Sequence, residues 1–160
     1  MEIFDASISN GSISDEDQQA IIELITELDK RWNERDAKAF ADLFDADADF
    51  QFFSGAWVKS KAAIETFRKN EVFPGLAGGL KPPSIIKRVS VISQDLVIGD
   101  GTLRFVDDSS GQDLIHSERE ATLIAVKKEG CWLISADRLS PIDISFTSNT
   151  QYLVNQIHKR

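Results

Sequence analysis

The acidic residues that lead into the first predicted strand are the first candidates for chemistry. Asp49 follows an acidic turn that contains Asp45 and Asp47, and it starts a run in which polar and aromatic residues alternate. A carboxylate beside an apolar ring, as Asp49 is beside Phe50, is the type of group that removes a proton from a carbon acid. Alternatively, Asp49 continues the acidic turn with its carboxylate in water, since aspartate is seldom buried. Gln51 lies on the same face of the strand, and its neutral amide costs less to bury.

A second group of candidates surrounds His116. By strand alternation, His116 shares one face with Glu118 and Glu120. A neighbouring carboxylate favours the imidazolium cation, which would let His116 donate a proton. Alternatively, the two glutamates are solvated and the histidine covers an edge of the sheet. His116 and Glu118 could contribute to a metal site, but the only other histidine is His158, in the tail, so we predict no metal.

Two arginines lie in strand-like segments that are otherwise mostly apolar. Inside a cavity, the guanidinium of Arg104 or Arg138 would hold a carboxylate or enolate through two hydrogen bonds. Alternatively, these arginines pair with acidic residues on an exposed or dimer face. The acidic candidates for such pairs are Asp100, Glu118 and Asp137.

The single cysteine, Cys131, excludes a disulfide within the chain and a zinc site built on thiolates. Lys128 is the only nearby basic residue, so we interpret the thiol as unreactive. The sequence also lacks a glycine-rich phosphate-binding loop with its Lys-Ser/Thr context. We therefore predict neither nucleophilic catalysis nor a cofactor.

The composition is that of one globular domain. The chain has 160 residues, of which 42% are apolar and 28% are charged. Its net charge of −8 arises in residues 1–80, which hold 16 acidic and 8 basic residues, and this half would repel nucleic acid. No apolar run approaches the ~20 residues that span a bilayer, and the N-terminus lacks the basic start of a signal peptide. We expect a soluble cytoplasmic protein with no nucleic-acid or membrane partner.

The first half of the chain is predicted to form helices and then an aromatic strand. Ser14 can cap a helix that ends near residue 33 and has acidic residues in its first turn. Asp36 caps a second, shorter helix that ends after Phe44, the strand covers 49–53, and Ser60 begins a third helix. The positions at helical spacing are Ile21, Ile25, Leu28 and Trp32 in the first helix, Phe40, Leu43 and Phe44 in the second, and Ile64, Phe67 and Arg68 in the third.

The second half is predicted to be a sheet. Residues 74–83 are rich in proline and glycine and form a loop. Turn signals then separate four segments rich in Val, Ile and Thr, which we interpret as strands over 84–93, 96–106, 114–128 and 131–139. Helices followed by an antiparallel meander indicate the α+β class. We expect a flexible arm over 1–13, a single domain over 14–140 and a C-terminal extension over 141–160.

The order of several short motifs supports a resemblance to a known superfamily. Trp-Asn-Glu-Arg-Asp ends the first helix, Asp-Ala-Asp-Phe leads into the strand, Gly-Ala-Trp-Val follows it, and Gly-Cys-Trp-Leu-Ile-Ser-Ala forms the last strand. Over about residues 15–140 this pattern resembles the nuclear transport factor 2-like superfamily, in particular its SnoaL-like branch of small bacterial proteins.

The resemblance implies a cone: three N-terminal helices packed on a strongly curved, mostly antiparallel sheet, with a deep cavity at the open end. Proteins of this group act as isomerases, polyketide cyclases or dehydratases, or only bind ligands, and many form dimers through the sheet. The aromatic residues expected to line an apolar site are Trp32, Phe40, Phe44, Phe53, Trp57 and Phe67. Relatives often carry a histidine near the end of the last strand, where this chain has Arg138.

The resulting functional hypothesis is a homodimeric pocket protein that binds a small apolar or cyclic molecule. If it is an enzyme, it transfers a proton next to a carbonyl without a cofactor, with Asp49, His116 and Arg138 as catalytic candidates. Arg104, Gln51 and Glu118 are candidate ligand-binding residues. The alternative is a non-enzymatic ligand-binding or protein-interaction module that uses the face of the sheet.

Overall fold

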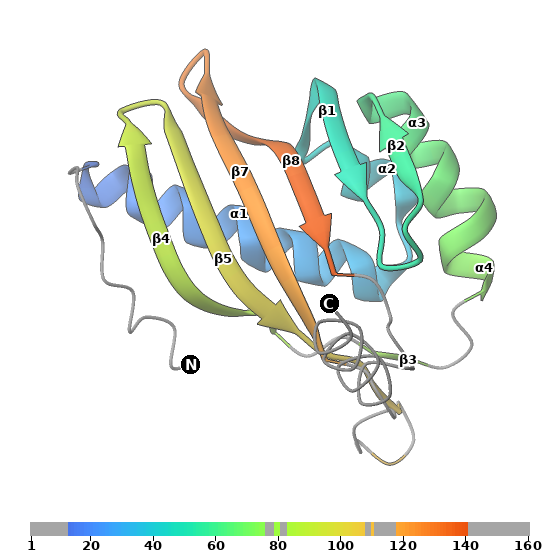
Figure 1. The fold of residues 1–160 in the computed structure, drawn as a ribbon. Helices are drawn as coiled ribbons and strands as arrows, with labels where there is room; N and C mark the ends of the chain where they lie inside the picture. Colours follow the sequence, from blue (N-terminus) through green and yellow to red (C-terminus); the bar gives the residue numbers. More distant parts are fainter. Residues whose placement is uncertain (1–12, 76–78, 81–82, 108–109, 111–117, 141–160) are drawn as a thin grey trace, which may run out of the picture.

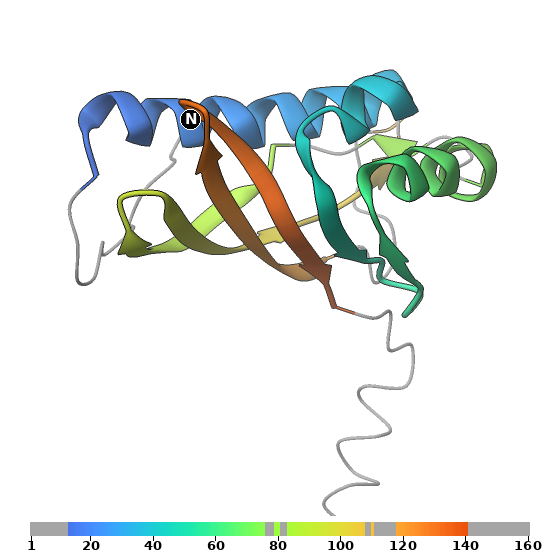
Figure 2. The ribbon, with the colours of Figure 1, turned by 90° about the horizontal axis from the view of Figure 1, so that it is seen from above.

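A long helix lies across one face of a curved, open sheet (Figures 1 and 2). The computed structural model describes residues 13–75, 79–80, 83–107, 110 and 118–140. The helices are α1 (Asp15–Glu34), α2 (Ala37–Ala41), α3 (Lys61–Phe67) and α4 (Phe73–Gly75), with a π-helical turn, η1 (Arg68–Val72), between the last two. The strands are β1 (Phe44–Gln51), β2 (Trp57–Lys59), β3 (Gly79–Leu80), β4 (Ile85–Ser93), β5 (Leu96–Leu103), β6 (Val106–Asp107), β7 (Arg119–Lys128) and β8 (Cys131–Leu139).

The main sheet has six strands in the order β2-β1-β8-β7-β5-β4. Its neighbouring strands are antiparallel except for β1 and β8, which are parallel. The helices α2, α3 and α4 lie near the β1–β2 end, and β3 pairs with β6 in a small second sheet (Figure 1). The predicted α+β class is confirmed.

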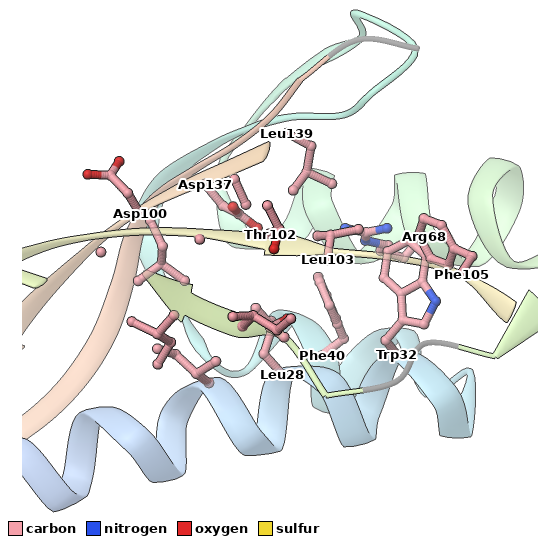
Figure 3. Close-up of a pocket in the computed structure, with 18 residues that line it drawn as sticks. Leu28, Trp32, Phe40, Arg68, Asp100, Thr102, Leu103, Phe105, Asp137 and Leu139 are labelled. Carbon is pink, nitrogen blue, oxygen red and sulfur yellow. The ribbon is translucent and has the colours of Figure 1, made fainter. Parts of the chain in front are cut away.

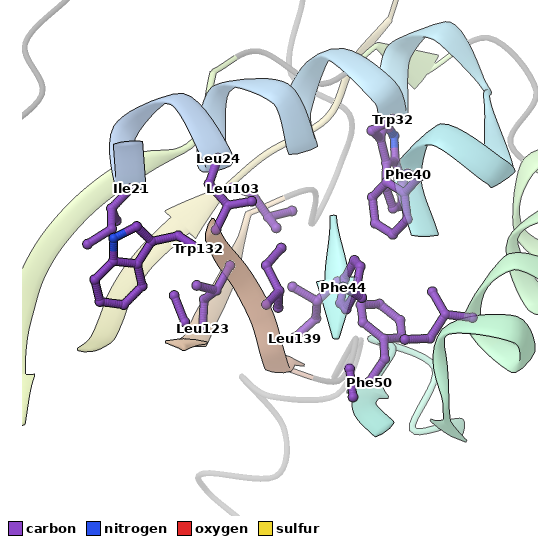
Figure 4. Packing of buried hydrophobic residues seen from close by; sticks show 14 of the residues in the cluster. Ile21, Leu24, Trp32, Phe40, Phe44, Phe50, Leu103, Leu123, Trp132 and Leu139 are labelled. Carbon is purple, nitrogen blue, oxygen red and sulfur yellow. The ribbon is translucent and has the colours of Figure 1, made fainter. Parts of the chain in front are cut away.

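The first helix is fixed at both ends by local signals. The side chain of Ser14 accepts a hydrogen bond from the backbone N–H of Asp17 and caps α1, and three acidic residues occupy the first turn. The helix ends at Arg35, which has a φ of 57° in the left-handed region. Ile21, Leu24 and Trp32 are buried on the side of α1 that faces the sheet (Figure 4).

Most of the buried aromatic residues gather at the end of α1 that carries Trp32. Phe40, Phe44 and Phe50 are among the most completely buried side chains, and Phe44 contacts both of the others with ring centroids 5.4 and 6.2 Å away. The predicted alternation in β1 is confirmed, because Phe50 is buried while Asp49 and Gln51 are partly exposed.

The main difference from the predicted elements lies between α2 and β1. The second helix ends at Ala41, and Phe44, which we predicted at the end of that helix, begins the strand instead. Phe44 pairs with Ile134 of β8, and the N–H of Ile134 donates to the carbonyl of Leu43 at 2.9 Å. The strand is therefore extended by pairing with a distant segment, which periodicity within the helix cannot reveal.

Several predicted boundaries lie outside the described residues. These include most of the N-terminal arm, the beginning of the 114–128 strand and the extension over 141–160, so the domain limits stay predictions. Among the described residues, no helix is long and apolar enough to cross a membrane. The same part of the chain contains no group of three or more His, Cys, Asp or Glu side chains placed to hold a metal ion.

Candidate functional site

A cavity of about 70 Å³ lies between α1 and the inner face of the sheet (Figure 3). Its volume exceeds the roughly 10–15 Å³ that one water molecule needs. The lining is mainly apolar and comes from α1, α2, η1, β4, β5, β7 and β8, and from residues next to β4 and β5. The polar and charged residues among those that line it are Arg68, Ser84, Asp100, Thr102 and Asp137.

The strand that faces α1 across the cavity carries two glycines. Gly99 and Gly101 both line it, and Leu103 follows on the same face of β5. Asp100 lies between the glycines, and its carboxylate accepts hydrogen bonds from Arg88 and Thr122. In Figure 3 this carboxylate points away from the cavity.

Arg68 is the least exposed charged side chain in the described part of the chain, at 1%. It begins the π-helical turn η1, where the N–H of Phe73 donates to the carbonyl of Arg68. Such turns often occur at functional positions. The guanidinium carbon lies over several aromatic rings, at centroid distances of 4.2 Å for Phe40, 4.3 Å for Trp32, 4.5 Å for Phe50 and 5.2 Å for Phe52.

The aromatic rings stabilise the cation of Arg68 but do not satisfy its hydrogen bonds. Within the described part of the chain, Nε and Nη1 of Arg68 are buried and have no hydrogen-bond partner. Burial lowers the pKa of Arg68 to about 9, although the carboxylate of Asp137 raises it. The group therefore stays charged at neutral pH, and it is held in this place at a cost in stability.

Asp137 is the second buried charged group of the cavity. It is 5% exposed, and it pairs across the sheet with Phe50 of β1 and Leu123 of β7. Phe50 in turn lies under the guanidinium of Arg68. The arrangement joins an anion and a cation in an otherwise apolar space, which is typical of sites that handle a developing charge.

Four of the predicted site residues lie on the opposite face of the sheet. Gln51 pairs with both Trp57 and Arg138, so the three belong to one row on the outer face. Arg138 forms an ion pair with Asp49, and its guanidinium carbon lies 4.5 Å from the ring centroid of Trp57, whose side chain is 61% exposed. None of these four residues lines the cavity, because strand alternation turns their neighbours Phe50 and Asp137 inward.

The remaining predicted residues are divided between cavity, core and surface. Trp32 and Phe40 line the cavity, and their contact with a ligand stays a prediction. Phe44 is buried in the core. Phe53 and Phe67 are partly buried and pack against the core cluster, but they do not line the cavity. The exposed residues are Arg104 and Glu118, and His116 lies outside the described residues.

Arg68 and Asp137 were not among the candidates from the sequence. Arg68 had been placed on the apolar side of the third helix together with Ile64 and Phe67, and this position already indicated burial. Asp137 precedes Arg138, so the inward residue of β8 was missed by one position. Alternation along β8 does not reveal it either, because the register of β8 with β7 shifts between Ile134 and Ala136.

Comparisons with solved structures identify the fold. A cystatin-like domain of unknown function from Nostoc punctiforme is 16% identical, with a TM-score of 0.75 over 92% of this chain and 88% of that chain. A nuclear transport factor 2-like protein from Novosphingobium aromaticivorans is 19% identical, with a TM-score of 0.67 over 84% and 88%. A hexachlorocyclohexane dehydrochlorinase, LinA type 2, is 17% identical, with a TM-score of 0.63 over 78% and 84%.

No protein-family model matches the sequence, and no curated protein matches it. The structural similarity nevertheless confirms the predicted fold, which is the cystatin-like fold of nuclear transport factor 2-like proteins. At these identities the similarity describes the fold, and the function has to be argued from the site.

Proposed function

We propose that the cavity binds a small, largely apolar carbonyl compound whose oxygen accepts a hydrogen bond from Arg68. The observation that carries this proposal is the buried guanidinium, 1% exposed, with two nitrogens that have no hydrogen-bond partner among the described residues. Leaving such donors unsatisfied is costly, and a ligand oxygen would relieve the cost. The apolar lining would bind the rest of the molecule.

The same pair of charges supports proton transfer next to the carbonyl. The carboxylate of Asp137 would take a proton from the adjacent carbon, and the electrons of that C–H bond would form an enolate. Arg68 would stabilise the negative charge on the enolate oxygen. If a C=C bond is conjugated with the enolate, return of the proton to the far carbon of that bond gives an isomer. If the next carbon carries a leaving group, its departure with the bonding electron pair gives an elimination product.

The fold is compatible with this chemistry. One structural neighbour is named as a dehydrochlorinase, so a protein of this fold carries out an elimination. In the present chain the step would use Asp137 and Arg68, and it does not require Asp49 or Arg138, which pair with each other on the outer face.

The experiment that tests this proposal is hydrogen exchange of 2-octanone in D₂O, followed by NMR. Wild-type protein is expected to speed the exchange of the protons beside the carbonyl. Asp137→Asn should keep binding but lose the exchange, whereas Arg68→Met should bind the ketone more weakly and lose the exchange. Arg138→Met removes a cation from the outer face and is the matched control, so it should exchange like the wild type.

Two results would overturn the proposal. One is the absence of both binding and exchange with the wild-type protein. The other is an Arg68→Met variant that binds and exchanges as well as the wild type, because the ligand oxygen would then have no need of the guanidinium.

A second candidate function is homodimerisation through the outer face of the sheet. It is supported by Trp57, which is 61% exposed and is covered on one side by Arg138. A second copy of the chain could cover the free side of the ring. Sedimentation equilibrium should then show a dimer for the wild type and a weaker dimer for Trp57→Ala, and a wild-type monomer would contradict this candidate.

A further inference from the structure

We infer that Gly99 determines which ligands the cavity accepts, by leaving room for their apolar end. The inference rests on the proposed function, since it concerns the ligand that Arg68 and Asp137 would hold. It starts from the two cavity-facing glycines of β5, which are glycines for different reasons.

Gly101 is required by the packing of the backbone. A Cβ atom at this position would clash with the carbonyl oxygen of Ile85 and would lie 3.3 Å from the Cα of Ile86. Strand β4 is irregular at this point, between Ile86 and Arg88, where its register with β5 shifts. A glycine lets the two backbones approach, so Gly101 serves the curvature of the sheet.

Gly99 has no such requirement. A Cβ atom there would lie 3.9 Å from the carbonyl oxygen of Leu123, which is an ordinary contact, and it would meet nothing closer. The φ angle of Gly99 is also outside the left-handed region, which among the described glycines only Gly55 and Gly130 adopt. Since a glycine in a strand interior lowers stability, a side chain at position 99 would be tolerated and even favoured by the fold. What it would occupy is the cavity.

The position of Gly99 indicates which part of the ligand lies there. On the inner face, Gly99 pairs with Leu123 of β7, and Leu123 pairs with Asp137 of β8. Gly99 is therefore two strands from Asp137, or roughly 10 Å at about 4.8 Å per strand. The side chains that line the cavity from α1 are apolar and include Ile25 and Leu28.

These relations give the ligand a direction. Its carbonyl lies at the end of the cavity with Arg68 and Asp137, and its apolar end extends towards Gly99. The chemical class is thus a carbonyl compound with an apolar chain or ring on one side, and the length of that side is limited at position 99.

The test is a series of methyl ketones from 2-butanone to 2-nonanone, measured by isothermal titration calorimetry. With the wild-type protein, affinity should rise roughly fourfold for each buried methylene until the ligand reaches Gly99. In Gly99→Val the rise should stop at a shorter chain, so that the longest ketone binds at least roughly tenfold more weakly while 2-butanone is unaffected. Gly99→Ala should fall between the two.

The outcomes separate this inference from the proposed function. Arg68→Met should weaken binding of every ketone by the same factor, whereas Gly99→Val should affect only the long ones. If Gly99→Val keeps the wild-type chain-length profile while Arg68→Met still weakens binding of every ketone, the inference about Gly99 is overturned and the proposed function stands. If the wild type binds none of the ketones, both are overturned. Thermal unfolding is the control for folding, and Gly99→Val should be at least as stable as the wild type.

Discussion

At Arg68, a cost in stability conflicts most clearly with the function that we propose. A guanidinium surrounded by aromatic rings gains cation–π attraction, yet two of its nitrogens have no hydrogen-bond partner among the described residues. Burial lowers its pKa to about 9 even with Asp137 nearby, so desolvation outweighs the attraction of that carboxylate. A charge that destabilises the folded state in this way is expected at a binding or catalytic site.

This conflict predicts a stabilised variant. Replacing both charges, as in Arg68→Met with Asp137→Asn, should raise the free energy of unfolding by about 1–4 kcal/mol at neutral pH. Urea unfolding measures the change. A double variant that is less stable than the wild type would show that the two charges hold the fold together, which would contradict a functional reason for them.

The difference in free energy of unfolding between the wild type and this double variant should also depend on pH. Because the folded-state pKa of Arg68 is below its ordinary value, the unfolded chain binds more protons than the folded chain above about pH 9. The buried charge of Arg68 therefore destabilises the fold by its full amount below about pH 9, and this destabilisation decreases as the pH rises through that value. The stability advantage of the double variant should shrink over the same range. An advantage that grows with pH would contradict the buried charge of Arg68 as the cause of the destabilisation.

At this scale the sequence predicted part of the site. Trp32 of α1 and Phe40 of α2 line the cavity, because the apolar face of each helix packs inward. Asp49 and Arg138 do not line it, since which side of a strand faces inward depends on its pairing with other strands. Two charged neighbours, Asp137 and Arg138, point to opposite faces, and the sequence does not distinguish them.

At the scale of elements, a hydrogen-bond cluster ties the start of α1 to the β7–β8 hairpin. The carboxylate of Asp17 accepts a hydrogen bond from Nε1 of Trp132 at 2.8 Å and forms an ion pair with Lys127 at 2.7 Å. The hydrogen bonds from Lys127 first, and then from Trp132, lower the pKa of Asp17. This cluster fixes where α1 crosses the sheet and so helps to set the space beneath it.

The cluster predicts a change in acid stability. Because the pKa of Asp17 is lower in the folded chain, the unfolded chain binds more protons, and the stabilisation present at neutral pH is lost as the pH falls below about 4. Asp17→Asn should be less stable than the wild type at neutral pH, and the difference should narrow near about pH 3. Urea unfolding at the two pH values measures this. If the difference in free energy of unfolding is the same at both pH values, the negative charge of Asp17 does not contribute to stability.

The two glycines of β5 give a prediction at the level of strand packing. Gly101→Ala should lower the free energy of unfolding by about 1–3 kcal/mol, because its methyl group would displace the backbone of β4 at Ile85. Gly99→Ala, in the same strand, should not lower it. Thermal unfolding of the two variants side by side checks the contrast, and equal losses would mean that both glycines serve the bend of the sheet.

The elements themselves were largely predictable from local signals. The caps at Ser14, Asp36 and Ser60 all accept hydrogen bonds from their helices as expected. The start of β1 at Phe44 was not predictable, since it depends on parallel pairing with β8, about ninety residues later in the chain. The π-helical turn at Arg68 leaves no recognisable signal in the sequence either.

At the scale of the whole molecule, the order of helices and strands was sufficient to predict the fold. The curved sheet around α1 agrees with the resemblance, and solved structures of the same fold confirm it at identities of 16–19%. The cavity could not be derived in the same way. Its lining is assembled from seven elements that meet only in three dimensions. Of its two charged groups, Arg68 comes from η1, and Asp137 faces the cavity because of the direction of alternation in β8.

The central claim concerns the whole molecule: a ligand carbonyl enters this cavity and binds Arg68. A crystal structure of the protein with 2-octanone tests it most directly. We predict that the ketone oxygen lies within about 3.2 Å of a guanidinium nitrogen of Arg68, at hydrogen-bond distance, and that the alkyl chain extends towards Gly99. A ketone bound elsewhere, for example against Trp57 and Arg138 on the outer face, with the cavity free of ligand, would contradict the account.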